Sequence, residues 1–289
     1  PCDENELYIA AQNGQVAMVR ALIELGAHVN QTRGDGAMAL CVAAQNGHEA
    51  IVRALIESGA DVNKAMNDSV TALYATSHQG HEAIVLALIE LGADVNQTRG
   101  DGVTALCIAA DKGHEAIVRA LIESGADVNK AMNDSVTALY ATSHQGHEAI
   151  VLALIELGAD VNKATDDGVT ALCIAAEKGQ EAVVRLLIEL GAEINKADND
   201  GWTPLFIAAQ EGHEAVGRAL IELGADVNKA TDDGWTPLAI AVQEGHEAVV
   251  WALIELGADV NKATEDGVTL LAIAVQEGHT AIVQILNDG

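Results

Sequence analysis

Apolar residues along this chain fall into two short helical patterns that recur from one end to the other. Residues 163–195 contain one copy of each pattern. Leu172, Ile174, Ala175 and Ala176 form a compact apolar block, which predicts a short first helix.

The second pattern follows within the same segment. Val183, Val184, Leu187 and Ile188 recur at spacings of one, three and four residues. This spacing places them on one face of a helix, so a second helix is predicted from about residue 181 to 190 with that face turned inward.

Turn-forming residues precede the first helix, and Gly residues are placed to end both helices. The run 165–168 combines Asp, which tolerates tight turns, with Gly, which reaches positive φ. Thr170 suits the N-cap of the first helix, and Gly179 and Gly191 are placed to end the first and second helices. Each segment is therefore expected to form two antiparallel helices and a projecting hairpin.

The segment belongs to a strictly periodic series, in which the string GADVN or a near copy begins every 33 residues without insertion. The starting residues are Gly26, Gly59, Gly92, Gly125, Gly158, Gly191, Gly224 and Gly257. Such a period is typical of arrays in which each unit buries its apolar face only against its neighbours. The sequence predicts an all-α repeat solenoid of helix-turn-helix units with projecting β-hairpin loops.

Two phrases of this series closely resemble the ankyrin repeat family. They are GWTPLFIAAQEGHEAV at 201–216 and LIELGADVN at 220–228, and the resemblance extends from about residue 6 to 286. It implies one repeat domain over residues 1–289, with about nine units: an N-terminal capping unit at about 1–29, internal repeats at about 30–261 and a C-terminal unit at about 262–289. It also implies non-catalytic protein–protein recognition through the hairpin tips and the concave helix face.

The array departs from the family pattern at two positions. A His that family members often carry after the TPL phrase is replaced by Cys41, Tyr74, Cys107, Tyr140, Cys173, Phe206, Ala239 and Ala272. We expect apolar packing to replace the hydrogen bonds that this His makes between repeats. Ser69 and Ser135 stand where other units carry the turn Gly.

The order of the units is also unusual. Residues 47–96 recur letter for letter as residues 113–162, a duplication over 66 residues. Natural tandem expansion and deliberate construction would both produce it.

The charge limits the possible partners. The chain carries 43 acidic and 15 basic residues, a net charge of −28. This charge opposes binding to nucleic acid and to anionic membranes, which need Lys and Arg to neutralise phosphate. It favours basic partners and opposes self-association, so a monomer is expected. Acidity that serves solubility alone is the competing interpretation.

The cysteines bear on the compartment. Cys41, Cys107 and Cys173 share one repeat position two units apart, which predicts sulfurs about 20 Å from one another, beyond disulfide reach. Free thiols, with no recognisable signal peptide or membrane span, predict an intracellular, cytoplasmic protein.

The sequence argues against metal binding and catalysis. The seven His residues that follow a Gly are His48, His81, His114, His147, His213, His246 and His279. One His per unit, roughly 10 Å apart, cannot share a metal ion with bonds near 2 Å, so structural hydrogen bonding is expected. The run 198–201 resembles the opening of a calcium loop, but Ala209 replaces its bidentate Glu. A solvated turn is favoured there, and loose calcium binding between tips stays open. We predict no catalytic, cofactor or metal site.

The candidate partner-binding residues lie at the hairpin tips and at the ends of the first helices. Trp202 and Trp235 stand beside acidic residues, an arrangement suited to an Arg or Lys side chain. Packing on a neighbouring hairpin is the competing interpretation. The full set is Asp35, Asp68, Asp101, Asp134, Asp167, Asp200, Asp233, Asp266, Trp202, Trp235, His78, Asp111, His144 and Glu177.

The resemblance also implies a modification. Asparaginyl hydroxylases act on ankyrin-repeat Asn residues, and the best matches follow Asp-Val: Asn63, Asn96, Asn129, Asn162, Asn228 and Asn261. A structural role for Asn in the hairpin backbone is considered primary.

The favoured function is recognition of a protein or extended peptide of basic character. Two alternatives stay open. One is an inert spacer or engineered repeat scaffold without a ligand, because the central tips nearly copy one another. The other is the ankyrin segment of a larger enzyme, channel or effector.

Overall fold

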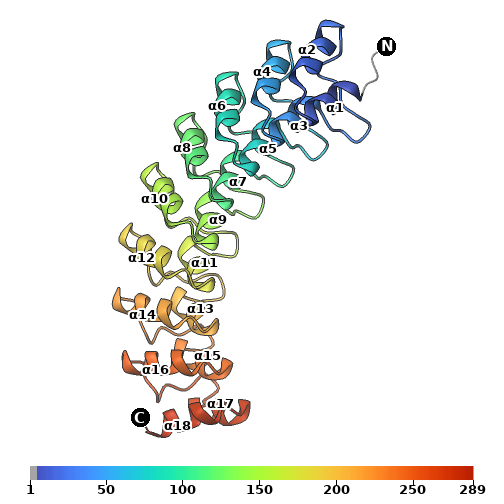
Figure 1. The fold of residues 1–289 in the computed structure, drawn as a ribbon. Coiled ribbons are helices and arrows are strands. Elements are labelled where there is room, and N and C mark those ends of the chain that lie inside the picture. Colours follow the sequence, from blue (N-terminus) through green and yellow to red (C-terminus); the bar gives the residue numbers. More distant parts are fainter. Residues whose placement is uncertain (1–4, 289) are drawn as a thin grey trace. The chain divides into compact units, whose positions relative to one another are not determined.

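A computed structural model describes residues 5–288, and the contacts within it divide the chain into two compact units. The first comprises residues 1–138 and 156–158, and the second comprises residues 139–155 and 159–289. The described residues form eighteen helices and no sheet, arranged as helix pairs (Figure 1). The predicted all-α repeat solenoid is confirmed. One domain over residues 1–289 stays a prediction.

The first unit contains four complete helix pairs, each a short inner helix followed by an outer helix. Their bounds are α1 Glu6–Gln12, α2 Val16–Glu24, α3 Ala39–Gln45, α4 Glu49–Glu57, α5 Ala72–Gln79, α6 Glu82–Glu90, α7 Ala105–Asp111 and α8 Glu115–Glu123. Inner helices α1, α3, α5 and α7 pack on one another in series, and outer helices α2, α4, α6 and α8 do the same.

The second unit repeats this arrangement. Its helices are α9 Ala138–Gln145, α10 Glu148–Glu156, α11 Ala171–Glu177, α12 Glu181–Glu189, α13 Pro204–Gln210, α14 Glu214–Glu222, α15 Pro237–Glu244, α16 Glu247–Glu255, α17 Leu270–Glu277 and α18 Thr280–Asp288. The inner helices pack on one another in the order α11, α13, α15 and α17. The outer helices do the same in the order α12, α14, α16 and α18. The predicted second helix at residues 181–190 is thus confirmed to within one residue.

Threonine starts most of the inner helices. The Thr170 hydroxyl accepts a hydrogen bond from the backbone N–H of Cys173, which satisfies one of the unpaired donors at the helix end. Thr71, Thr104, Thr203, Thr236 and Thr269 act in the same way. Met38 holds this position in α3, where no side chain caps the helix.

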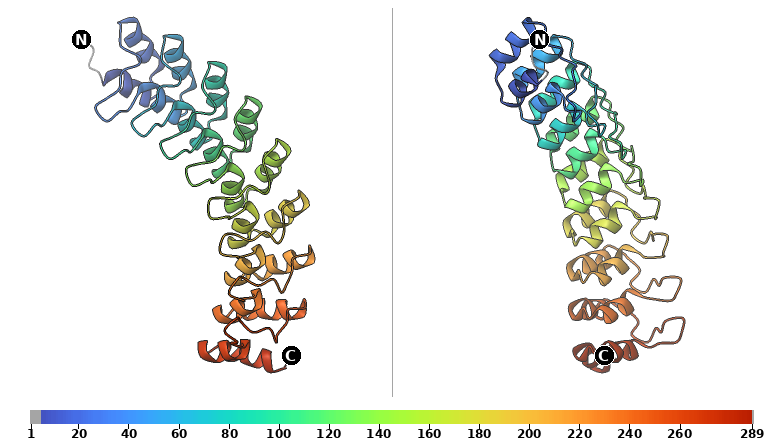
Figure 2. Two further views of the ribbon diagram at one scale, coloured as in Figure 1. Left: turned by 180° about the vertical axis from the view of Figure 1, so that it is seen from behind. Right: turned by 90° about the vertical axis from the view of Figure 1, so that its right-hand side faces the viewer.

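The connecting loops form narrow hairpins that project from one side of the helices within each unit (Figure 2). Isolated antiparallel bridges close three of them, at Thr32 with Met38, Thr98 with Thr104, and Ala164 with Thr170. The hairpins are therefore held by turns and single bridges rather than by a continuous sheet.

The core of each unit is an aliphatic seam between successive helix pairs. Ile51, Leu88 and Leu121 are fully buried in the first unit, and Leu172, Leu187 and Leu220 in the second. Alanines of the inner helices, such as Ala44 and Ala176, have no exposed surface. Their small size lets neighbouring backbones approach closely.

Three hydroxyl groups interrupt this seam. The Oγ atoms of Ser77 and Ser143 and the Oγ1 atom of Thr142 are buried and have no hydrogen-bond partner. Ala44, Ala110 and Ala176 occupy the place of the two serines in other repeats and bury it without a polar atom. The alternating repeats that carry Ser therefore bear an unpaired polar atom in the core, which costs stability.

Candidate protein-recognition surface

The eight predicted tip carboxylates are all exposed to solvent. In the first unit, Asp35 and Asp101 also accept a backbone N–H two residues on, so each carboxylate closes its own turn. Arg33 and Arg99 form ion pairs with them, at 3.4 and 2.6 Å. These two tips are therefore partly neutralised before any partner arrives.

A groove runs between adjacent hairpins and the ends of the inner helices in the second unit. It has a volume of about 380 Å³, and its floor and walls come from two successive repeats. Its lining residues are Asp167, Val169, Glu177, Asp198, Asn199, Asp200, Trp202, Ile207, Gln210 and Glu211. Five acidic residues therefore line the same groove as Trp202.

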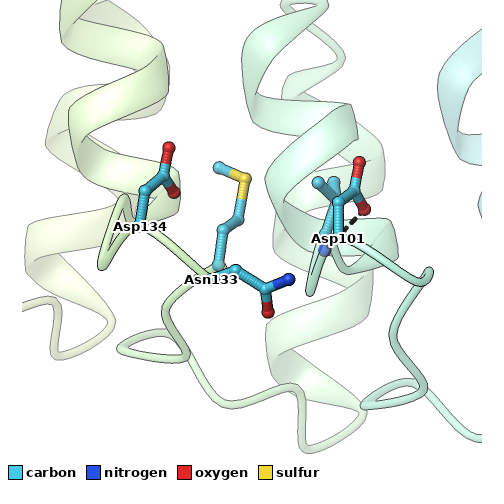
Figure 3. Close-up of a pocket in the computed structure, with 5 residues that line it drawn as sticks. Asp101, Asn133 and Asp134 are labelled. Carbon is cyan, nitrogen blue, oxygen red and sulfur yellow. Dashed lines mark hydrogen bonds between the residues drawn. The ribbon is translucent and has the colours of Figure 1, made fainter.

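The same groove recurs at equivalent repeat positions. In the second unit a groove of about 260 Å³ lies between Trp235 and Val268, with Asp266 and Glu277 in its lining. In the first unit a hollow of about 350 Å³ is lined by Asp101, Val103, Met132, Asn133 and Asp134. Figure 3 shows the first-unit copy, with the Asp101 and Asp134 carboxylates on neighbouring hairpins.

Trp202 packs within its own repeat and also lines the groove. Its ring packs against Phe206, with centroids 5.5 Å apart, and its backbone N–H donates to Asp198. The same residue lines the groove and stays partly exposed. The ring is therefore packed on one side by Phe206 within the same repeat, and Trp202, as a residue of the groove wall, is half-buried rather than enclosed.

The predicted helix-end residues are less uniform. His78 is exposed, while Asp111 and Glu177 form ion pairs with their neighbours Lys112 and Lys178, at 2.9 and 2.6 Å. His78 and Asp111 belong to the first unit, and His144 and Glu177 to the second. Of these four, Glu177 lines a groove together with a Trp.

The His at the start of most outer helices is structural, as predicted. The Nε2 atom of His213 lies 2.8 Å from the carbonyl oxygen of Glu177, and that of His246 lies 2.8 Å from that of Gln210. His48, His81, His114 and His279 make the equivalent contact to the preceding repeat, and Gln180 makes it through its amide. No group of three His, Cys, Asp or Glu side chains suited to a metal ion occurs among the described residues.

Apolar packing is only part of what replaces the family His after the TPL phrase, so that expectation is corrected. The thiols of Cys41 and Cys173 lie 4.0 and 3.9 Å from carbonyl oxygens of the following hairpin, as weak donors. Arg99 donates to the Tyr74 hydroxyl at 3.0 Å and lies over its ring. These residues reach the neighbouring hairpin, as a polar side chain would.

The Tyr–Arg contacts were missed from the sequence. Arg33 also lies over the Tyr8 ring, 4.5 Å from its centroid. A signal was present, because Tyr8 and Tyr74 each precede an Arg by 25 residues. The groove residues Asp198, Gln210 and Glu211 were also missed, since only the packing of two repeats places them beside Asp167 and Glu177.

In most repeats, the Asn that ends the GADVN string has its side chain occupied by backbone groups of the following repeat. Asn63 donates to the Gly92 carbonyl at 3.2 Å and accepts from the Asp94 N–H at 2.7 Å. Asn96 and Asn228 make the same pair of bonds. The structural role is confirmed, and hydroxylation stays a prediction.

The geometry defines the class of protein: a helical repeat protein with grooves between the hairpins of each unit. A family model described as ankyrin repeats (3 copies) matches residues 7–99, 93–165, 158–231 and 224–289. The chain belongs to the ankyrin repeat family. Ankyrin repeats are generally protein–protein interaction modules, typically without catalytic activity.

A solved structure supports the same fold. The crystal structure of the human ASB11 ankyrin repeat domain is 27% identical, covers 76% of this chain and 98% of its own, and gives a TM-score of 0.70. No curated protein matches the sequence. None of the helices in the described part is long and apolar enough to cross a bilayer.

Proposed function

We propose that this protein recognises a basic segment of a partner protein through the acidic grooves between its hairpins. The observation that carries the proposal is the groove of the second unit, where Trp202 lies among Asp167, Glu177, Asp198, Asp200 and Glu211. An Arg or Lys side chain suits this chemistry, since carboxylates attract its charge and an indole face attracts a cation.

The grooves of the second unit are the favoured site. The exposed carboxylates of Asp167 and Asp200 face the ligand there, whereas Arg33 and Arg99 already pair with tip carboxylates in the first unit. The recurrence of the groove around Trp235 supports an extended segment that presents basic side chains to successive repeats. Affinity then comes from several modest contacts acting together.

The test is binding of fluorescent peptides followed by anisotropy. An Arg-rich peptide is expected to bind, and a peptide of equal length with Glu in place of Arg is not. Binding should weaken as NaCl rises from about 20 to 500 mM, because salt screens exposed charges. The double variant Asp167→Asn/Asp200→Asn should bind roughly threefold to tenfold more weakly.

A charge-matched control separates the groove from the net charge. Glu156→Gln/Glu189→Gln removes the same two charges from exposed positions on the outer helices α10 and α12. Equal losses in the two double variants would mean that only the overall acidity attracts the peptide. If both double variants keep full affinity for the peptide, the groove is not the binding site.

An inert spacer remains the second candidate function, because residues 47–96 and 113–162 are identical. Duplicated tips cannot distinguish different ligand side chains. Failure of every basic peptide to bind at low salt would favour this candidate.

A further inference from the structure

The first and last of the described repeats each expose apolar side chains whose counterparts in other repeats are mostly buried. On the N-terminal side, Met18 of α2 is 52% exposed, whereas Ile51, its counterpart one repeat on, is fully buried. Ile9 of α1 is 48% exposed against 6% for its counterpart Ile207. A hollow of about 550 Å³ lies on this face, lined by Gln15, Val16, Ala17, Met18 and Ala21.

The C-terminal face is the complementary half of the same kind of interface. Val275 of α17 is 62% exposed, whereas its counterpart Val242 is fully buried. Leu271 is 40% exposed against 1% for Leu238. Internal repeats bury these positions under the next helix pair.

Successive repeats are also joined by a hydrogen bond from the His or Gln at the start of an outer helix to a carbonyl oxygen of the preceding repeat. The last repeat has the acceptor of this bond without the donor, and the first repeat has the donor without the acceptor. Within the second unit, a Cβ placed on Gly245 would lie 2.6 Å from the His279 ring, which also meets the Gln243 carbonyl at 2.9 Å. At Gly278, one repeat later, such an atom would meet nothing within 4 Å. The corresponding carbonyl belongs to Gln276.

The first repeat carries the matching donor. Gln15 is exposed and occupies the position of His48 and His279. Gln180, at the same position, donates its side-chain amide to the His144 carbonyl. Gln15 can therefore make this contact with a carbonyl of another molecule.

We propose that the occupant of these faces is a second copy of the chain, stacked so that the C-terminal face of one copy covers the N-terminal face of the next. The contact continues the repeat-to-repeat interface across two molecules, with Val275 and Leu271 against Met18 and Ile9. Gln15 of one copy donates to the Gln276 carbonyl of the other. Because the two faces differ, the contact is heterologous, and each added copy keeps one face that can bind a further copy, so the assemblies grow with concentration.

Charge sets the conditions for stacking. With a net charge of −28, copies repel one another at low salt. Added salt screens this repulsion and leaves the apolar contact intact. Stacking should therefore strengthen with salt, the opposite of peptide binding, so the two proposals can fail separately.

The test is sedimentation velocity of the full chain at about 5–200 µM in about 20 and 500 mM NaCl. At high salt and the highest concentration, the weight-average mass should rise to at least about twice the 29.9 kDa of one chain. At low salt it should remain near that of one chain. A single mass at every concentration and salt level would overturn the proposal.

Face-specific variants sharpen the test. Met18→Lys blocks one face and Val275→Lys the other, so each variant alone should remain a monomer. An equimolar mixture should form a dimer and nothing larger, because only one intact pair of faces is available. Both changes lower the net negative charge, so increased repulsion cannot explain a loss of stacking.

A matched control places the same change elsewhere. Trp251→Lys alters a residue of α16 that is 56% exposed and lies outside both end faces. This variant should stack as the parent does, with an unchanged helical circular dichroism spectrum in all three variants. Loss of association in Trp251→Lys alone, or a dimer from either face variant alone, would refute the end-to-end contact.

Discussion

At the residue scale, a few side chains depart from the repeated pattern and carry a local cost. The turn Gly of most hairpins has positive φ, as at Gly36 and Gly102. Ser69 and Ser135 hold the same position with φ of 58° and 62°. A side chain in this left-handed region is strained, since its Cβ crowds the backbone. The sequence showed the replacement, and the structure shows that the turn keeps its shape.

The double variant Ser69→Gly/Ser135→Gly should be more stable than the parent. We expect a gain of about 0.5–1 kcal/mol per site, because relief of left-handed strain exceeds the entropy that Gly adds to the unfolded chain. Thermal unfolding followed by circular dichroism measures it. Ser58→Gly is the control, since Ser58 has φ of −92° and donates to the Ala54 carbonyl, and it should lose stability. A lower melting temperature in the double variant would show that Ser69 and Ser135 are not strained by their positive φ.

The buried thiols should make the protein sensitive to alkali. Burial raises the pKa of Cys41 from its ordinary 9.0 to about 12. Between these pH values the unfolded thiol releases its proton while the folded thiol keeps it, so stability falls as pH rises. The loss attributable to this thiol should be roughly 1 kcal/mol at pH 10.

The measurement is the melting temperature from pH 8 to pH 11 for the parent and Cys41→Ala. Ala239 and Ala272 show that Ala is compatible with this position. The variant should lose less stability than the parent over this range, since other alkaline groups titrate in both. Parallel curves would show that the Cys41 thiol contributes nothing.

At the element scale, each helix pair depends on contacts with the next pair. The sequence predicted both helices, the Thr cap and the ending Gly, because these follow from local spacing and backbone preference. It did not reveal that the Gly after an inner helix makes room for a ring of the following repeat. A Cβ on Gly179 would lie 2.9 Å from the His213 ring, which holds the Glu177 carbonyl.

Gly179→Ala should therefore destabilise the protein more than Gly191→Ala. Both positions have positive φ, so each should lose about 1 kcal/mol to backbone strain. Nothing lies within 4 Å of a Cβ on Gly191. At Gly179 the His213 ring must move and its hydrogen bond is lost, which should cost roughly 0.5–1.5 kcal/mol more. Chemical denaturation of both variants gives the comparison, and equal losses would show that the ring simply adapts.

At the scale of the whole molecule, uncompensated charge dominates. Most ion pairs are exposed, such as Arg53 with Glu49, and pairs of this kind contribute little. The net charge of −28 leaves a repulsion that these pairs do not cancel, and this repulsion acts against the folded state.

Salt should accordingly stabilise the fold. We expect the melting temperature at pH 7.5 to rise by about 2–5 °C between low and about 500 mM NaCl, at protein concentrations low enough to prevent stacking. At pH 5, closer to the isoelectric point near 4.4, the rise should shrink because fewer carboxylates are charged. A melting temperature that falls with salt at pH 7.5 would mean that ion pairs outweigh repulsion.

The sequence by itself determined the repeat, its two helices, and the residues that begin and end each helix, because these features depend on neighbours within one 33-residue unit. It also determined the acidic character, which follows from composition alone. Only the tertiary structure decided which side chains meet between units. Trp202 lines a groove with five acidic residues, the Ser77 hydroxyl has no hydrogen-bond partner, and Tyr74 accepts a hydrogen bond from Arg99. These contacts depend on distances across stacked helices, which the periodicity of one unit does not encode.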